Sequence, residues 1–242
     1  MGMGRPILTT QYIQSHTVGV AGTQDVIWGP LYDSLAYPSA GQQQLSFFTQ
    51  PQGQGTSSAP GAGAVVKTVF DTNMITNNQL SLGNEFYAIG SETLFFPGVN
   101  NNTSTTASFA LEPGGSPQAV AGANLGPGLF WNDVYNVGNG GIKVLTVGTD
   151  RKYIQDGPLN MFPPATRLAG VAALATGDTA TTVAQISYAV WSGEPYTLVP
   201  IYIQSTQQFT LQVTFAALIP TPSGTIGRLQ ERLRGYLIRQ AT

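Results

Sequence analysis

The sequence predicts an all-β sandwich, and two observations support this prediction. Gly and Pro are frequent, with 29 and 16 copies in 242 residues, and they separate short apolar segments that mostly alternate with polar residues. A strand buried on one face has this period of two, whereas a helix repeats about every 3.6 residues. Hydrophobic residues make up 42% of the chain, so a core can form although only 9% of the residues are charged.

The strand candidates follow one another along the chain. Residues 209–215 give the clearest pattern, because Phe, Leu, Val and Phe alternate with Thr and Gln. Residues 80–96 are expected to form one long strand, or two in line, with irregularities at Gly83 and Gly90. Residues 130–135 are expected to form a helical turn or an edge segment. The other strand candidates are residues 45–49, 142–147, 153–154, 185–191 and 198–203.

The last segment of the chain fits two periods. Leu229, Leu233 and Leu237, at a spacing of four residues, suit one face of a helix. The same leucines, together with Glu231 and Gly235, suit one face of a strand equally well. The central glycine favours the strand, which would direct the leucines into the core and the neighbouring arginines outward.

The chain divides into an arm and a domain. Residues 1–43 are polar with widely spaced aromatic residues, so we expect an extended N-terminal arm there. Residues 44–242 are expected to form one domain, near the usual size of roughly 100–200 residues. The densest cluster of Gly and Pro, at residues 112–128, offers an alternative boundary inside that domain.

The residue types present exclude several kinds of chemistry. The chain has no cysteine and a single histidine, His16, so thiol catalysis and disulfides are excluded and structural zinc is strongly disfavoured. The glycine-rich segments 61–63 and 138–141 lack the Lys-Ser/Thr pair of a phosphate-binding loop. The acidic residues form no calcium loop. We therefore expect no catalytic residue, no metal ligand and no cofactor.

The N-terminus and the hydropathy of the chain bear on where the protein is made. The first residues lack the apolar centre of a secretory signal, and no apolar run approaches the roughly 18 residues of a membrane span. We therefore expect a soluble protein that is made and assembled in the cytoplasm.

Basic residues concentrate at the C-terminus. The last fifteen positions carry a net charge of +3, whereas the remaining 227 residues carry −5. Such a strip can neutralise the phosphates of nucleic acid or the headgroups of an anionic membrane. The alternative is that these arginines pair with carboxylates on neighbouring subunits or face water. The residues concerned are Arg228, Arg232, Arg234 and Arg239.

The C-terminal third resembles the closing strands of jelly-roll major capsid proteins from small tailless icosahedral bacteriophages. The resemblance lies in the Leu-x-Pro-Ile-x-Ile pattern of residues 198–203, in residues 208–213, and in the Leu-x-Gly-x-Leu-x-Arg pattern that ends at Arg239. Residues 79–98 are similar to the strand that follows the N-terminal arm in such proteins. The resemblance implies a jelly-roll β-sandwich. A single roll is favoured over a compact double roll, because two rolls in 242 residues would leave very short loops.

The resemblance and the composition together suggest a structural role. Few charges, abundant Gly, Thr, Asn and Gln, and an extended arm suit a subunit that buries its sides against neighbours. We therefore expect a non-enzymatic virion protein that self-assembles as a homo-oligomer into capsomers and an icosahedral capsid shell. Its further partners would be other virion proteins and, through weak contacts of the C-terminal arginines, the packaged genome or an internal membrane.

Two other functions remain as alternatives. A lectin-like jelly roll would bind carbohydrate by stacking sugar rings on Trp131, Tyr135 or Trp191, although each of these side chains is equally suited to a core. A glycosidase would need two carboxylates at a defined separation, which the sequence does not specify.

Overall fold

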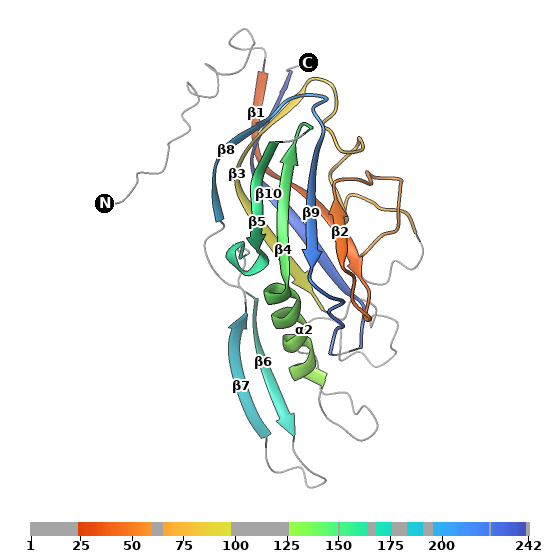
Figure 1. Cartoon of the computed structure of the whole chain (residues 1–242), viewed down its shortest axis with the longest axis vertical. Coiled ribbons are helices and arrows are strands. Elements are labelled where there is room, and N and C mark those ends of the chain that lie inside the picture. Colours follow the sequence, from red (N-terminus) through yellow and green to blue (C-terminus); the bar gives the residue numbers. More distant parts are fainter. Residues whose placement is uncertain are drawn as a thin grey trace, which may run out of the picture.

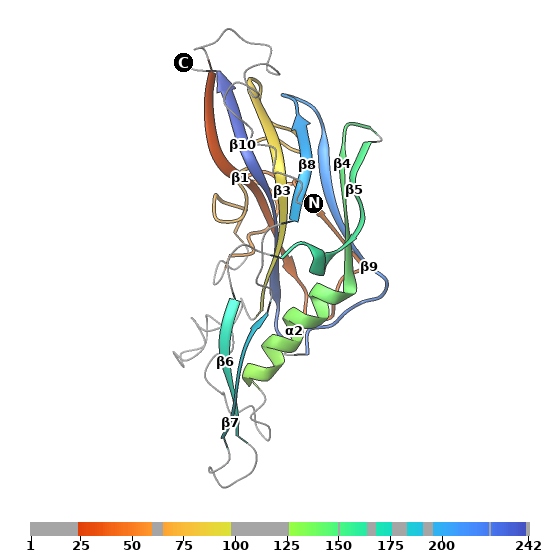
Figure 2. The ribbon, with the colours of Figure 1, turned by 90° about the vertical axis from the view of Figure 1, so that its left-hand side faces the viewer.

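The computed structural model describes residues 24–59, 65–97, 126–149, 151–163, 168–175, 183–190, 196–222 and 224–240. These residues form two four-stranded sheets, a two-stranded hairpin and a helix. The two sheets lie face to face as the layers of a β-sandwich (Figure 1 and Figure 2). The predicted all-β sandwich is therefore confirmed.

The first sheet has the strand order β1-β10-β3-β8. All three of its strand pairs are antiparallel. Its longest strands are the two that come from opposite ends of the described chain, and they pair over 14 residues. The bounds are β1 Gln24–Tyr37, β3 Asn84–Phe96, β8 Tyr196–Ile203 and β10 Gly227–Gln240.

The second sheet has the order β2-β9-β4-β5, again with antiparallel pairs only. Its strands are β2 Gln44–Phe47, β4 Gly141–Val147, β5 Arg151–Pro158 and β9 Phe209–Phe215. Alternate residues of β9 are buried, as its sequence predicts. These buried residues meet those of the first sheet in one continuous hydrophobic core.

A helix and a hairpin lie together at one end of the sandwich. Helix α2, Gly126–Gly140, precedes β4, and the hairpin of β6, Leu168–Ala175, and β7, Val183–Val190, follows β5. The helix contacts both hairpin strands and the short 3₁₀ helix η2, Leu159–Met161. The helix and the hairpin extend beyond the same end of the two sheets (Figure 1). No helix among the described residues is both long and apolar enough to cross a membrane.

The end of the chain forms a strand rather than a helix. In β10, Leu229, Glu231, Leu233 and Gly235 are buried, while the intervening Arg232 and Arg234 are partly exposed. Gly235 lies so close to β3 that an added Cβ would stand 1.8 Å from the carbonyl oxygen of Tyr87. This close approach explains why a glycine occupies the middle of the strand.

A bulge in β3 lies opposite this glycine. Gly235 pairs with Ala88 and Arg234 with Gly90, so one residue of β3 has no opposite partner. Because successive residues of a strand point to opposite faces, an extra residue reverses the face taken by those that follow. Tyr87 and Glu92 can therefore both lie on the outer face. The irregularity predicted near Gly90 is confirmed.

The free edge of β1 is covered by a loop between β2 and β3, which we call the capping loop (residues 48–59 and 65–83). Thr72 forms an isolated antiparallel bridge with Asp33. Asn73 accepts a hydrogen bond from the backbone N–H of Tyr32 at 3.0 Å and returns one to its carbonyl at 3.3 Å. Covering an edge in this way prevents uncontrolled pairing with another strand.

The structure corrects the expected arm for part of its length. Residues 24–37 lie inside the predicted arm of residues 1–43, but they form β1, and its Leu31 and Tyr37 belong to the core. Residues 1–23 lie outside the described residues. The predicted internal boundary at 112–128 also falls outside them, except for 126–128, which begin α2. The residues predicted as a helical turn or edge segment, 130–135, are helical.

Candidate interaction face on the first sheet

The outer face of the first sheet carries three of the four arginines that the sequence singled out. Because β10 lies between β1 and β3, its outward side chains are flanked on both sides by those of its neighbours. Arg228, Arg232 and Arg234 occupy alternate positions of this strand, opposite Phe96, Glu92 and Gly90 of β3. The sequence thus predicted correctly that these arginines point away from the leucines.

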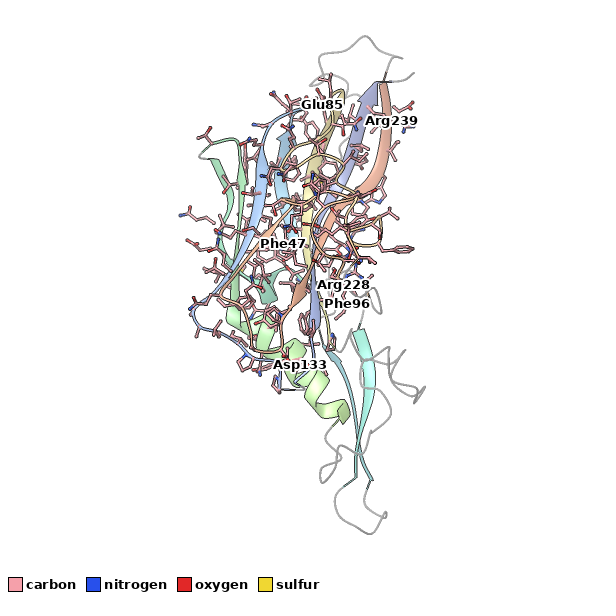
Figure 3. The ribbon with its side chains drawn as sticks, turned by 90° about the vertical axis from the view of Figure 1, so that its right-hand side faces the viewer. Phe47, Glu85, Phe96, Asp133, Arg228 and Arg239 are labelled. Carbon is pink, nitrogen blue, oxygen red and sulfur yellow. The ribbon has the colours of Figure 1, made fainter. Side chains whose placement is uncertain are left out.

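Arg228 is held by the capping loop. Its guanidinium donates hydrogen bonds to the hydroxyl of Ser34 at 3.0 Å and to the carbonyl of Phe70, and it stands 5.6 Å from the ring centre of Phe96. Figure 3 shows Arg228 beside Phe96. Burial lowers the pKa of Arg228, while the charge of Asp71 opposes that shift. The contacts of this guanidinium are therefore mostly with residues of its own subunit.

Arg232 and Arg234 share the environment of a buried carboxylate. Arg234 forms an ion pair with Glu92 at 3.1 Å, and the carboxylate side chain is only 3% exposed. Arg232 donates a hydrogen bond to the side chain of Gln230 at 2.8 Å. Burial lowers the pKa of Arg232, and the charge of Glu92 acts in the opposite direction. The guanidinium of Arg234 also stands 5.6 Å from the ring centre of Trp28, within the range of a cation–π contact.

Arg239 lies at the other end of β10, far from Arg228 (Figure 3). It pairs with Asp25 of β1 at 3.3 Å, and both side chains are about half exposed, at 52% and 50%. An exposed pair of this kind contributes little to stability. Two of the four arginines are thus paired with carboxylates of the same chain, whereas the alternative sequence interpretation expected carboxylates of neighbouring subunits or water.

An aromatic row crosses the same outer face. Trp28 pairs in register with Tyr236, Tyr236 with Tyr87, and Tyr87 with Tyr202, so one aromatic residue comes from each strand of the first sheet. The rings of Trp28 and Tyr236 pack edge to face with centres 5.0 Å apart, and those of Tyr87 and Tyr202 also lie 5.0 Å apart. Trp28 remains 51% exposed.

The inner face of the same strands holds a buried ion pair. Glu231 of β10 and Lys143 of β4 meet across the sandwich at 2.9 Å, and both side chains are fully buried. The ammonium also donates to the hydroxyls of Ser91 and Thr93 at 2.9 Å each, and it lies over the ring of Phe162 at 3.9 Å. Burial raises the pKa of Glu231 and lowers that of Lys143, and the opposite charge of each partner counteracts the shift.

A second buried ion pair joins β1 to the capping loop. Lys67 approaches the carboxylate of Asp33 to 2.7 Å, and both side chains are fully buried. The carboxylate also accepts hydrogen bonds from the backbone N–H groups of Ser34 at 3.0 Å and Phe48 at 2.6 Å. Phe48 has a positive φ of 65°, so this bond fixes an unusual backbone conformation at the exit of β2. Burial raises the pKa of Asp33, and Lys67 opposes the shift.

These arrangements define what the described residues can do chemically. Among the fully buried acids, Asp33 and Glu231 are each bonded to a lysine, and Asp71 accepts hydrogen bonds from Ser57, Ser58 and Thr68, so none of these three is placed to meet a substrate. Among the described residues, no three His, Cys, Asp or Glu side chains are grouped to hold a metal ion. Of the aromatic residues that the carbohydrate-binding alternative names, only the side chain of Tyr135 is described, and it is 64% exposed.

Comparisons with known proteins give no independent assignment. No protein-family model matches the chain, no curated protein matches it, and no solved structure matches it. The geometry of the described residues is therefore the basis for the proposals below.

Sequence reasoning missed the aromatic row and both buried ion pairs. Lys143 shares its strand face with Leu145 and Val147, so the period of two in residues 143–147 was a usable signal that this lysine points inward. The aromatic row had no comparable signal, because its members are brought together by strand pairs distant in sequence and by the bulge in β3.

Proposed function

We propose that the sandwich is a single jelly roll. The chain passes between the two sheets in the order β1, β2, β3, β4-β5, β8, β9 and β10, so strands from the two ends of the fold are paired. This nested order supports the jelly roll, in which eight strands form two Greek keys. The helix and the hairpin are additions to the connections β3–β4 and β5–β8.

We propose further that the protein is a non-enzymatic shell subunit, a capsid protein that assembles with copies of itself in the virion. The observation that carries this proposal is the outer face of the first sheet. Protein interfaces are enriched in Trp, Tyr and Arg and depleted in other charged residues. The face combines an aromatic row with three arginines, of which Arg234 is paired with Glu92 of the same chain.

Additional exposed apolar side chains support self-association. On the capping loop, Val65, Val66 and Val69 are each about half exposed, and Phe70 and Ile75 are 73% exposed. A solitary subunit with few charges would leave this surface in water, which favours association. In this proposal residues 1–23 remain an extended arm that contacts neighbouring subunits.

The C-terminal arginines have a smaller role in this proposal than the sequence suggested. Contacts with a packaged genome or an internal membrane would have to compete with Glu92 and Asp25 for Arg234 and Arg239. Binding of phosphate groups by these arginines is thus weak and depends strongly on salt. Neighbouring copies and other virion proteins are its main partners.

Electron microscopy tests the proposal directly. Negative staining of the purified protein should show closed particles or regular capsomers, and light scattering should give a mass well above the 25.5 kDa of one chain. Replacing Trp28 with alanine should weaken assembly strongly. Tyr153→Ala is the matched control, because Tyr153 is 42% exposed on β5 in the other sheet. A monomer at high protein concentration over a range of salt and pH would contradict the proposal.

A further inference from the structure

An open groove of about 470 Å³ lies between the edge strands β1 and β2 and the capping loop. Its floor includes the apolar side chains of Leu35 and Leu45. Its lining carries amide and hydroxyl groups and contains no charged residue. The polar lining residues are Gln42, Gln44, Ser46, Thr49, Gln50 and Thr56.

The backbone of β2 offers hydrogen-bond donors at this groove. The N–H of Phe215 donates to the carbonyl of Gln43 at 2.8 Å. Because hydrogen-bonded pairs alternate along antiparallel strands, Leu45 directs its N–H toward β9, and Gln44 and Ser46 direct theirs to the free edge of the sheet. An extended polypeptide can bind such an edge through its main chain, and uncharged side chains of the groove suit an uncharged segment.

The chain itself contains a segment of that kind. Residues 7–15, Ile-Leu-Thr-Thr-Gln-Tyr-Ile-Gln-Ser, carry no charge and are rich in residues that favour strands. We propose that residues 7–15 of a second copy bind in this groove as an added strand beside β2. The inference rests on the proposed function, since it names the contact by which one shell subunit would hold the next.

The position of the groove favours a second copy over the segment's own chain. Residues 1–23 join β1 at Gln24, whereas the groove lies beside Leu35, about 35 Å further along an extended strand. A segment returning along its own β1 would meet Thr72 and Asn73, which already occupy that edge. A neighbouring copy can deliver its segment from outside, and 23 extended residues reach up to about 80 Å.

Photocrosslinking in the full-length chain tests the proposal. Tyr12 is replaced by p-benzoyl-phenylalanine, equal amounts of ¹⁴N- and ¹⁵N-labelled protein are mixed before assembly, and crosslinked peptides are mapped by mass spectrometry. We expect crosslinks to residues 42–56, in peptides of mixed isotope composition. The same group placed at Tyr153, on the opposite edge strand, serves as the control and should not label residues 42–56. Crosslinks confined to other regions, or to residues 42–56 of the same chain, would overturn the proposal.

A pair of substitutions tests the role of the β2 edge. Ser46→Pro removes an N–H that does not bond to β9, so the sheet itself is preserved, while Ser46→Ala keeps the N–H. We expect Ser46→Pro to lower the yield of crosslinks to residues 42–56 about tenfold, the effect of about one lost hydrogen bond, and Ser46→Ala to leave it unchanged. Equal yields in two variants that both fold, judged by circular dichroism, would contradict the added strand.

The outcomes separate this inference from the shell proposal. Closed particles with crosslinks that map elsewhere would refute the groove contact and leave the shell function standing. Intermolecular crosslinks to residues 42–56 in a protein that forms only small oligomers would support the groove contact and refute the shell.

Discussion

The charged side chains on the two faces of β10 differ in how deeply they are buried. On the inner face, Glu231 is fully buried, pairs with Lys143 and accepts a hydrogen bond from the hydroxyl of Thr93, so its charge is matched at the atomic level. On the outer face, Arg234 is 34% exposed and lies between the buried carboxylate of Glu92 and the exposed ring of Trp28. The inner charges hold the two sheets in one register, whereas the outer charges remain accessible for contacts with another molecule.

The largest loss of stability is expected from breaking the buried ion pair between Lys143 and Glu231. Lys143→Met leaves the carboxylate of Glu231 buried without its counter-charge, and we expect a loss of about 3–5 kcal/mol in the free energy of unfolding. Urea denaturation measures this loss. The double variant Lys143→Met/Glu231→Leu removes both charges and should recover most of the stability. A double variant as unstable as the single one would mean that the pair is not isolated in the core.

The second largest loss of stability is expected from a substitution in the apolar part of the same inner face. Leu233 is fully buried between the two sheets, so Leu233→Ala should lower the free energy of unfolding by about 2–5 kcal/mol. Leu218→Ala is a suitable control, because that leucine is 58% exposed and should cost little. Equal losses for the two variants in denaturant titrations would contradict the assignment of Leu233 to the core.

Two arginines of β10, Arg234 and Arg239, should differ in their effect on stability. Arg234→Gln leaves Glu92, only 3% exposed, without its ion pair, so we expect a loss of about 1–3 kcal/mol. Arg239→Gln removes a half-exposed pair and should change stability by about 0–1 kcal/mol. Thermal unfolding of the two variants at low and high salt compares them. Equal shifts would mean that the burial of Glu92 does not matter.

In the capping loop, the carboxylate of Asp71 should make the stability of the fold depend on pH. Burial by itself would raise the pKa of Asp71, but hydrogen bonds from Ser57, Thr68 and Ser58 outweigh it and hold the pKa below the ordinary value of 3.8. A depressed pKa in the folded state stabilises the fold above the pKa of the unfolded chain, and the stabilisation disappears as the pH falls through the folded value.

Asp71→Asn removes this contribution. We expect a lower stability at neutral pH and a smaller decrease in stability on acidification below about pH 4. Urea titrations of the wild type and the variant between neutral pH and acid give both quantities. Parallel stability curves for the two proteins would contradict the depressed pKa.

Regular patterns within single strands were predictable from the sequence. Strand β9 has the predicted bounds, and in β10 the glycine among the leucines correctly favoured a strand over a helix. Both strands have one apolar face, so their period of two is set by residues close in sequence. The same local signal located β4, β7 and β8 to within a few residues.

Features that depend on distant partners were not predictable in this way. Strand β1 contains Asp33, Ser34 and Pro30 among its apolar residues, and its polar composition suggested an arm. Asp33 is acceptable in the core only because Lys67 reaches it from the capping loop, 34 positions later. The aromatic row likewise requires the pairing of strands from both ends of the chain.

The pairing of β1 with β10 also has a consequence for the order of events during synthesis. Gln24 lies opposite Gln240, so the first described strand cannot pair with β10 until residues 227–240 have left the ribosome. Contacts between such distant segments form late and slowly. A chain that ends before residue 227 lacks the strand that joins β1 to β3, and with it the centre of the aromatic row. In the proposed shell, the topology would therefore exclude incomplete chains from assembly, because only chains that contain β10 present the complete outer face.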